Sequence, residues 1–534
     1  MFRRDFLMTT AQAIAAQALS ARAHTSPKVG LVASSHTRLP HPVSTGHPLD
    51  YELVRDMVWK AIEYGRPRAG SLANKIPPGS WVVIKPNIVS IPPRRAFRIG
   101  DVTDFRVTRA VLEYVARYSK AGRVTIAEGG SYRCVGDPTK DNAYTQNGQR
   151  ADAFSWDWGS DYFEGFGGSL SGMLADMAVL GPGKRFDYVD LSYDAVRDPG
   201  GTFRRVNVPT APNGVGAFGN RPDYYVTNTI LNCDFLIDIP VAKVHANSGI
   251  TACLKNYVGT APRQAYAGPG TFSNGGLHSE QTVEGRIDPF IVDLAAFHPP
   301  DYNVVDGIRG LQYSEHNNGR PDQMLRNNLV IAGEDAVAVD AAVGYLLGFN
   351  PWDFEFLHMA AQRGLGNREF SSVDFAGDEP DRFRQTWAKP RNWYGRCNRD
   401  WLVTRDPEAP LESWSRHTIP TDTLHFAKWG AAKPPAGSAF GAAVRVHADG
   451  HRKAYLWTGA SGRVTAYLNG EMVLERDAGT RYRIGQFRTP VELRPGENLL
   501  RFRLRATNDE PRLSAFLVGP RNDGDTVEGI RWSV

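Results

Sequence analysis

The residues with the clearest capacity for chemistry lie between Leu231 and Gly259, in the segment LNCDFLIDIPVAKVHANSGITACLKNYVG. Lys243, His245 and Lys255 place three groups that can carry positive charge within thirteen residues of a mostly small and apolar segment. Lysines hold carboxylates or phosphates, and a histidine exchanges protons near neutral pH. The cluster therefore predicts a site that binds an anion and moves a proton, the alternative at each position being a solvated surface charge.

A buried strand is expected to position these groups. Residues 233–241 (CDFLIDIPV) form a run of mostly apolar and β-branched residues, which is typical of a strand covered on both faces in a parallel sheet. Lys243 and His245 are two positions apart, so an extended backbone points both to one face. A helix capped by Asn247 or its neighbour and continuing through Lys255 is expected next. Ligands bind at the carboxyl ends of such strands and at helix N-termini, which predicts an anion-binding crevice here.

Two earlier strands end in comparable groups. The apolar run in SWVVIKPN ends at Lys85 and Asn87, separated by Pro86, which cannot donate to a strand ladder. RVTIAEGG ends at Glu128, followed by two glycines that permit a tight turn. The periodicity of residues 108–119 predicts a helix between the two strands, and the order strand, helix, strand predicts a parallel sheet.

Three further residues extend the candidate site. Asp306 is expected at the end of a strand, and Asp340 lies among small apolar residues of a predicted helix. A buried carboxylate needs a cation, a backbone amide or a metal as partner, so Glu128, Asp306 and Asp340 are candidate ligands of a divalent metal, although their spacing is not diagnostic. For Asp340 the alternative is a capping hydrogen bond. His278 lies in the Gly/Ser-rich loop 260–286, where a catalytic loop could sit.

Composition excludes several functions. The 534 residues are 42% hydrophobic and 22% charged, as in an ordinary globular protein of several domains. A net charge of +5 without a dense basic stripe gives no case for binding nucleic acid. The four cysteines, Cys134, Cys233, Cys253 and Cys397, form no CxxC pair, so neither an iron–sulfur cluster nor a zinc ribbon is expected.

Residues 1–23 have the layout of an export signal. Arg3 and Arg4 precede a mildly apolar, Ala-rich stretch that ends in an A-x-A site at Ala23. This layout resembles a twin-arginine signal peptide, so we expect the twin-arginine export machinery as a partner and a periplasmic or secreted location. The alternative is an amphipathic or disordered cytosolic start. No run reaches the ~18 apolar residues of a spanning helix, so no stable membrane span is expected.

The remaining patterns predict the domain organisation. Residues 24–425 are expected to form an α/β domain, with a mostly parallel sheet, helices on both faces, and an insertion or lid over 134–206 that is rich in glycine and aromatic residues. Residues 426–534 alternate every two positions between turn signals such as Asn469-Gly470, which predicts an all-β sandwich.

Several of these motifs together resemble a known family. IKPN, AEGG, PVAKVH, TACLKNYVG, VVDGI and GEDAVAVDAAVG, in this order, resemble the domain of unknown function 362 across residues 80–370. The resemblance implies the α/β fold and the place of the site, but no assigned activity. Family members are sometimes fused to ferredoxin-like modules, whose clustered cysteines this chain lacks. The C-terminal region looks like jelly-roll modules found beside carbohydrate-active enzymes, which either bind glycan or pack against the main domain.

Two hypotheses of function follow. The first is an enzyme that acts on a small anionic substrate, a sugar acid or another hydroxy acid, either as an isomerase or epimerase or as a metal-assisted hydrolase. In it His245, Lys243 and Glu128 are catalytic, and the substrate is bound by Lys85, Asn87, Lys255, Asn256 and His278. The second is a non-catalytic exported protein that captures an anion or a carbohydrate. Exchange of His245 for glutamine separates them, because only a proton shuttle then loses orders of magnitude in rate.

Overall fold

The structure is a computed structural model. It describes residues 26–33, 48–88, 100–129, 144–146, 149–151, 157–266, 287–391, 393–396, 398–419, 422–429 and 433–534. The predicted signal segment 1–23 and His278 lie outside these ranges. The chain divides into two compact units, which are described separately: Met1–Pro351 with Glu355–Arg391, and Trp352–Phe354 with Asn392–Val534.

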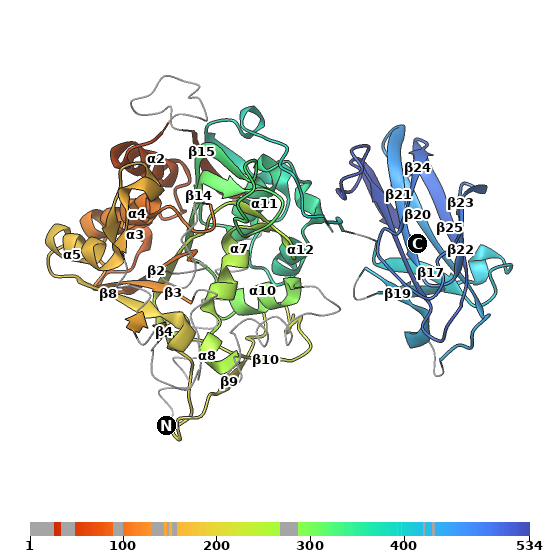
Figure 1. Ribbon diagram of the computed structural model, residues 1–534, viewed down its shortest axis with the longest axis horizontal. Helices are drawn as coiled ribbons and strands as arrows, with labels where there is room; N and C mark the ends of the chain where they lie inside the picture. The colour runs from red at the N-terminus through yellow and green to blue at the C-terminus, as the bar shows by residue number, and fades with distance from the viewer. Residues whose placement is uncertain are drawn as a thin grey trace. The chain divides into compact units, whose positions relative to one another are not determined.

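An eight-stranded mixed sheet forms the centre of the first unit (Figure 1). In spatial order its strands are β16 (Asp374–Gly377), β1 (Lys28–Ala33), β15 (Met324–Gly333), β14 (Tyr302–Leu311), β11 (Phe235–Ile239), β2 (Trp81–Pro86), β3 (Arg123–Glu128) and β8 (Arg185–Asp190). β15 runs antiparallel to both of its neighbours, whereas every other neighbouring pair in this order is parallel. The prediction of a mostly parallel sheet is confirmed.

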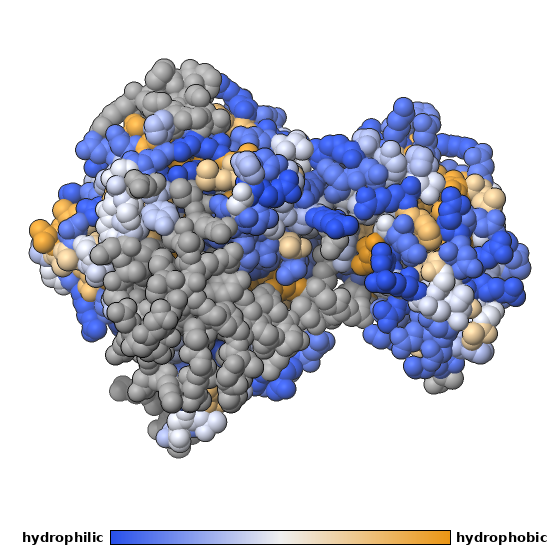
Figure 2. Space-filling model, viewed as in Figure 1, coloured by the Kyte–Doolittle hydropathy of each residue, from blue (hydrophilic) through white to orange (hydrophobic). Residues whose placement is uncertain are grey.

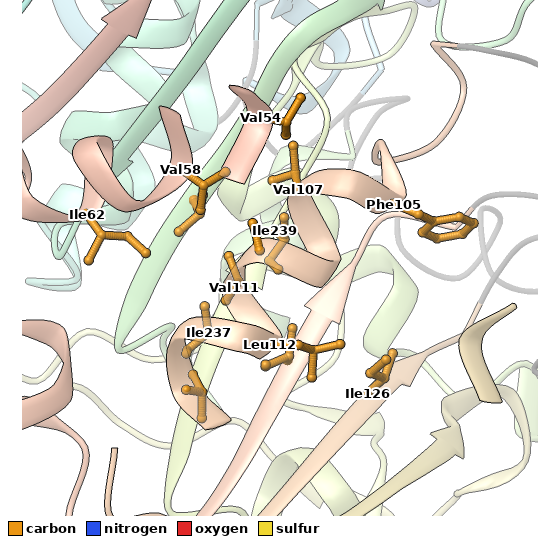
Figure 3. Packing of buried hydrophobic residues seen from close by; sticks show 14 of the residues in the cluster. Val54, Val58, Ile62, Phe105, Val107, Val111, Leu112, Ile126, Ile237 and Ile239 are labelled. Carbon is orange, nitrogen blue, oxygen red and sulfur yellow. The ribbon is translucent and has the colours of Figure 1, made fainter. Parts of the chain in front are cut away.

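One face of this sheet packs on an extended cluster of buried hydrophobic residues. The helices α2 (Tyr51–Tyr64), α4 (Phe105–Tyr118) and α5 (Leu170–Leu180) contribute to the cluster together with alternate residues of the strands. Figure 3 shows Val107 and Val111 of α4 among Ile237 and Ile239 of β11. Because side chains alternate along a strand, the intervening Asp238 points to the opposite sheet face.

The predicted strand, helix and strand around residues 81–128 are confirmed. β2 and β3 pair in parallel and α4 connects them in the chain. The helix begins three residues earlier than the predicted 108, because the side chain of Asp104 caps it by accepting a hydrogen bond from the backbone N–H of Arg106 at 3.0 Å.

Part of the predicted insertion 134–206 is integral to the main sheet. Its strand β8 pairs in parallel with β3, and its helix α5 contacts both α4 and β8. No residue of β8 is fully buried, because the strand lies at the sheet edge, and so its sequence lacks the apolar run of a buried strand. The remaining described strands of this segment are β4 (Tyr144–Gln146), β5 (Gln149–Ala151), β6 (Asp157–Trp158), β7 (Gly168–Ser169) and β9 (Arg205–Asn207).

Short elements complete the unit around the sheet. The helices are α3 (Leu72–Lys75), α6 (Asn228–Asn232), α7 (Cys253–Asn256), α8 (Arg263–Tyr266), α10 (Asp288–Ala295), α11 (Ala336–Leu346) and α12 (Glu355–Gln362). Three further strands form hairpins, β10 (Asp223–Tyr225) with β9 and β12 (Lys243–His245) with β13 (Gly249–Thr251). Helix α11 contacts α7, β14 and β15, so it holds α7 near the middle of the sheet.

The second unit is a two-sheet β structure with its own core. One sheet contains β18 (Ser415–Thr418), β17 (Asp400–Thr404), β20 (Ala439–Ala448), β25 (Gly496–Arg505), β22 (Arg463–Leu468), β23 (Glu471–Asp477) and β27 (Ile530–Ser533). The other contains β19 (Leu424–His425), β26 (Arg512–Val518), β21 (Arg452–Ala460) and β24 (Phe487–Leu493). The main segment of this unit begins at Asn392 rather than at the predicted 426. The reason is that β17 pairs with β20 and β18 pairs with β17, so both strands belong to the larger sheet of this unit.

The face of the molecule shown in Figure 2 is mainly hydrophilic over the residues that the structure describes. Figure 2 shows hydrophobic residues only in small separate groups over the coloured part of this face. Among the helices that the structure describes, none has the length and apolar character needed to cross a bilayer.

Candidate functional site

The carboxyl ends of β2 and β3 bring four of the predicted site residues together. The Nζ of Lys85 donates to Glu128 Oε2 at 2.7 Å and to Asn256 Oδ1 at 3.0 Å. Asn87 Nδ2 donates to the same Asn256 oxygen at 2.9 Å. Asn256 in turn donates to Asp238 Oδ1 at 2.7 Å. Lys85, Glu128 and Asn256 are at most 2% exposed, so the lysine charge is neutralised inside the protein.

Two glycines let the backbone approach this group. A Cβ on Gly259 would lie 2.2 Å from Glu128 Oε1 and 2.7 Å from Lys85 Nζ, so any side chain there would displace the ion pair. The backbone N–H of Gly129 donates to Glu128 Oε1 at 2.8 Å. Gly129, one of the two glycines predicted after Glu128, and Gly259, which was not predicted, therefore lie against a carboxylate of the protein itself.

Lys243 and His245 do not continue β11. That strand ends at Ile239, before Pro240, and the two residues belong to β12, which pairs antiparallel with β13. Both lie on one face of β12, as their spacing predicts. The predicted helix starting near Asn247 is wrong, because Gly249 adopts a φ of 81° and starts the return strand β13. The helix begins only at Cys253.

His245 is a buried, neutral imidazole. It is 6% exposed, and burial, together with the nearby charge of Lys255, lowers its pKa well below the ordinary value. Its Nδ1 accepts the backbone N–H of Asn247 at 3.1 Å. The neutral ring therefore carries its proton on Nε2, which lies 3.9 Å from Glu315 Oε1. In this state the ring offers a hydrogen-bond donor rather than a free lone pair.

Lys255 differs from the other two lysines. It is 7% exposed, and within the described parts of the chain its ammonium has neither a hydrogen bond nor an ion pair. Burial lowers its pKa, Glu315 opposes the shift, and the charges of Lys243, Arg263 and Lys85 reinforce it, so that the pKa is about 7. All three predicted lysines thus share one electrostatic environment, and Lys255 is the one that remains available to a ligand. Lys243 donates to the carbonyl of Asp101.

Two unpartnered polar atoms belong to residues of the same elements. Within the described residues, neither Thr251 Oγ1 in β13 nor Asn87 Oδ1 beyond β2 has a hydrogen-bond partner, although both atoms are buried. A buried oxygen without a partner is costly unless a ligand or water supplies one. Together with Lys255 they are groups that a polar ligand could partner.

Asp340 holds the start of α7 rather than a metal. Its Oδ1 accepts the N–H of Cys253 at 2.6 Å and its Oδ2 accepts the N–H of Leu254 at 2.9 Å. Burial raises its pKa to about 7. The capping alternative of the sequence analysis is therefore the arrangement found, although the capped helix is α7 and not the helix that carries Asp340.

The three predicted metal ligands do not fit a divalent ion as a set. Asp306 accepts backbone N–H groups from Asp104 at 2.7 Å and Ile308 at 2.9 Å, and Glu128 pairs with Lys85. No group of three His, Cys, Asp or Glu side chains is arranged to hold a metal in the ranges that the structure covers.

Sequence reasoning missed three residues of the site. Asp238 is fully buried in β11, and an acidic residue inside an otherwise apolar run is a signal that could have identified it. Arg263 is 1% exposed and donates to the carbonyl of Gly129 at 3.2 Å. Glu315 accepts the N–H of Ala246 at 2.9 Å. The sequences around Arg263 and Glu315 contain no apolar run, so neither residue can be distinguished from an ordinary surface charge by its neighbours in the chain.

Two cavities lie elsewhere. One of about 330 Å³ is lined by Lys28, Arg66 and Glu334 among others, and one of about 740 Å³ in the second unit by Lys453, Tyr455 and others. Neither is lined by a predicted site residue. The candidate site is therefore identified by buried charged side chains that several elements bring together, and not by the shape of a cavity.

Part of the chain that carries the candidate site is similar to a known family model. Residues 200–344, which include Lys243, His245, Lys255, Asp306 and Asp340, match the model of the family "Domain of unknown function (DUF362)". No curated protein matches the chain.

Several solved structures are similar to a small part of the chain. One is a family 35 carbohydrate binding module from an environmental isolate, with 14% identity, a TM-score of 0.14, and coverage of 20% of this chain and 76% of that one. Another is a family 2 glycosyl hydrolase from Bacteroides cellulosilyticus, with 14% identity, a TM-score of 0.17 and coverage of 22% and 20%. A third is the β-glucuronidase of Ruminococcus gnavus in complex with uronic isofagomine, with 18% identity, a TM-score of 0.16 and 20% coverage of each chain. The match thus spans about a fifth of each glycosidase.

Proposed function

We propose that this chain, with its DUF362 region at residues 200–344, is an enzyme that moves a proton on a small anionic substrate, a sugar acid or another hydroxy acid. The observation that carries the proposal is the state of Lys255: buried, without a described partner, and with a pKa of about 7. An amine that is half protonated near neutral pH can both accept and return a proton.

Charge in the site favours an anion. Four cationic groups, Lys85, Lys243, Lys255 and Arg263, influence this environment, whereas Glu128 neutralises only Lys85 and Glu315 lies near His245. A carboxylate bound beside Lys255 would restore the charge balance of the buried group. The Nε2–H of His245 would then donate to an oxygen of the substrate.

The proposed step transfers one proton. The neutral amine of Lys255 takes a proton from the carbon next to the substrate carboxylate, and the electron pair of the broken C–H bond is delocalised onto the carboxylate oxygens. Lys243 and the Nε2–H of His245 stabilise the charge that develops there. Protonation of the same carbon on its other face by solvent gives the epimer, whereas protonation by Lys255 on the original face regenerates the substrate. In this arrangement His245 polarises the substrate, and Lys255 is the base.

The layering of the first unit supports a closed site. We infer that helices cover both sheet faces, with α2 and α4 on one and α7 and α11 on the other. This inference rests on the alternation along β11, whose Ile237 and Ile239 face the first pair of helices while Asp238 bonds to Asn256 of α7. Helices on both faces leave the carboxyl edge as the place for a ligand.

Deuterium exchange tests the proposal without knowledge of the product. The protein is incubated in D₂O with a panel of sugar acids and hydroxy acids, and mass spectrometry measures deuterium at carbon. We expect incorporation into at least one compound, a loss of at least a hundredfold with Lys255→Met, and a comparable loss with His245→Gln. Lys120→Met, which changes an exposed lysine after α4, is the matched control and retains the wild-type rate.

The alternative hypothesis gives a different result. A non-catalytic protein would bind a panel compound in calorimetry without any deuterium incorporation, and His245→Gln would weaken that binding only modestly. Equal exchange by wild type and Lys255→Met would contradict the proposed base.

We also propose export by the twin-arginine route, on the strength of Arg3 and Arg4 and the A-x-A site at Ala23. Residues 1–23 fused to a reporter should direct it to the periplasm, and exchange of both arginines for lysine should abolish export. Cytoplasmic retention of the unmodified fusion would contradict the proposal.

A further inference from the structure

A cysteine, a histidine and an aspartate meet at the opposite edge of the main sheet. Cys233 directly follows α6 and precedes β11, while His298 and Asp301 precede β14. β11 and β14 are parallel neighbours, so both segments lie at the amino ends of adjacent strands. The lysine cluster follows the carboxyl end of β11, which makes this a separate place in the fold.

The three side chains lie close enough to interact, with the sulfur almost equally far from both imidazole nitrogens. The Sγ of Cys233 lies 3.7 Å from His298 Nδ1 and 3.9 Å from Nε2, and Nε2 lies 3.4 Å from Asp301 Oδ2. Asp301 is held in place, because the same Oδ2 accepts the N–H of Leu236 at 2.9 Å. A thiol next to a histidine that a carboxylate orients is the usual arrangement of an activated cysteine.

We propose that Cys233, His298 and Asp301 form a second reactive site, in which a thiolate paired with an imidazolium reacts with small electrophiles of the peroxide class. The thiolate sulfur attacks one peroxide oxygen, an S–O bond forms and the O–O bond breaks. The sulfur is oxidised by two electrons to a sulfenic acid, and the peroxide is reduced. The departing hydroxide takes the proton of His298 and leaves as water.

The surroundings keep the imidazole of His298 charged. Although burial alone would lower it, hydrogen bonding to Asp301 and to Cys233 raises the pKa of His298 to about 10, so the ring remains protonated through neutral pH. The other titratable groups nearby are Tyr257, whose hydroxyl donates to the His298 carbonyl at 2.6 Å, and Lys75, which donates to the Asp301 carbonyl. Neither bonds to the imidazole nitrogens. The Sγ also lies 3.8 Å from the carbonyl of Ile230, which accepts a hydrogen bond only when the sulfur is protonated.

The site is open enough for a small reagent. The side chains of His298 and Asp301 are 18% and 27% exposed, and Cys233 itself is 6% exposed. Cys253 provides an internal comparison, because it is completely buried, and burial followed by the charge of Asp340 raises its pKa well above the ordinary value.

The test follows alkylation of each cysteine in the folded wild-type chain. Iodoacetamide labelling is quenched at intervals from pH 5.5 to 8.5 and mapped by peptide mass spectrometry. We expect Cys233 to react at nearly the same rate at pH 6 and pH 8, and Cys253 to remain unlabelled. His298→Asn should lower the Cys233 rate at pH 6 at least tenfold and restore the rise with pH of an ordinary thiol. A tenfold rise per pH unit in the wild type would overturn the ion pair, even if the variant fails to fold.

A second measurement tests the peroxide step itself. The wild type is treated with hydrogen peroxide in the presence of dimedone, which traps sulfenic acids. We expect a dimedone adduct on Cys233, at least tenfold less of it with His298→Asn, and the same yield as the wild type with Lys120→Met, which changes an exposed lysine. Absence of the adduct from the wild type overturns the peroxide step.

Discussion

Lys85 and Glu128 form an ion pair of 2.7 Å in which neither side chain is more than 2% exposed. Taking one partner from such a pair leaves the other charge buried without compensation, which costs more than the pair itself contributes. The pair also lies against Gly259, so its geometry and the backbone after α7 depend on each other.

Lys85→Met should therefore destabilise the first unit by about 3–5 kcal/mol in chemical denaturation, because Glu128 remains buried. Lys28→Met is the matched control. Lys28 pairs with Asp374 at 3.3 Å, but the side chains are 35% and 53% exposed, so that change should cost at most about 1 kcal/mol. Equal losses of unfolding free energy in the two variants would contradict the claim that burial makes the Lys85–Glu128 pair more costly to break.

Lys255 should make the stability of the wild type depend on alkaline pH. Its folded pKa of about 7 lies below the 10.5 of an ordinary lysine, so between these values the unfolded chain holds a proton that the folded chain lacks. The free energy of unfolding consequently rises with pH across this window, by at most about 1.4 kcal/mol per pH unit from this group. Lys255→Met should flatten the rise between pH 7 and 9 in denaturant titrations. An unchanged slope would show that Lys255 is not desolvated.

His245 should make the stability of the wild type depend on acidic pH. Its folded pKa lies well below 6.5, so as the pH falls through 6.5 the unfolded chain takes up a proton first and the folded state loses stability. His245→Gln cannot take up this proton and should lose less stability than the wild type between pH 7 and 5. Thermal melts at both pH values measure the difference, with His447→Gln at an exposed position of β20 as the control. Identical acid losses in wild type and His245→Gln would contradict a neutral, buried ring.

Asp340 should stabilise the protein by accepting hydrogen bonds from two backbone N–H groups. Asp340→Ala leaves the N–H groups of Cys253 and Leu254 without their acceptors, at about 1–3 kcal/mol for each buried group. Hydrogen exchange of these two amides should accelerate, while the amides of β2 keep their wild-type protection. Because Asp340 binds amides rather than a metal, a chelator should leave the stability of the wild type unchanged. Loss of wild-type stability in the chelator would contradict this account.

The sequence alone was sufficient for the main strands and for part of the site. Apolar runs ending at polar residues located β2, β3 and β11, because buried parallel strands require such runs whatever surrounds them. The spacing of Lys243 and His245 placed both on one face, since alternation is a local property of an extended chain. The alternation after residue 438 likewise indicated the second unit, but not its start, because β17 and β18 belong to it only through pairing with β20.

Only the tertiary structure decided which charges are neutralised. The sequence treats Lys85, Lys243 and Lys255 as equivalent, but Glu128 pairs with the first, the carbonyl of Asp101 accepts from the second, and the third has no described partner. Glu128 lies 43 residues from Lys85 in the chain. Local pattern cannot rank such contacts, because the free energy of a buried charge depends on every group that folding brings within a few ångströms of it. The same reason hid the meeting of Cys233 with His298, which only the parallel pairing of β11 and β14 creates.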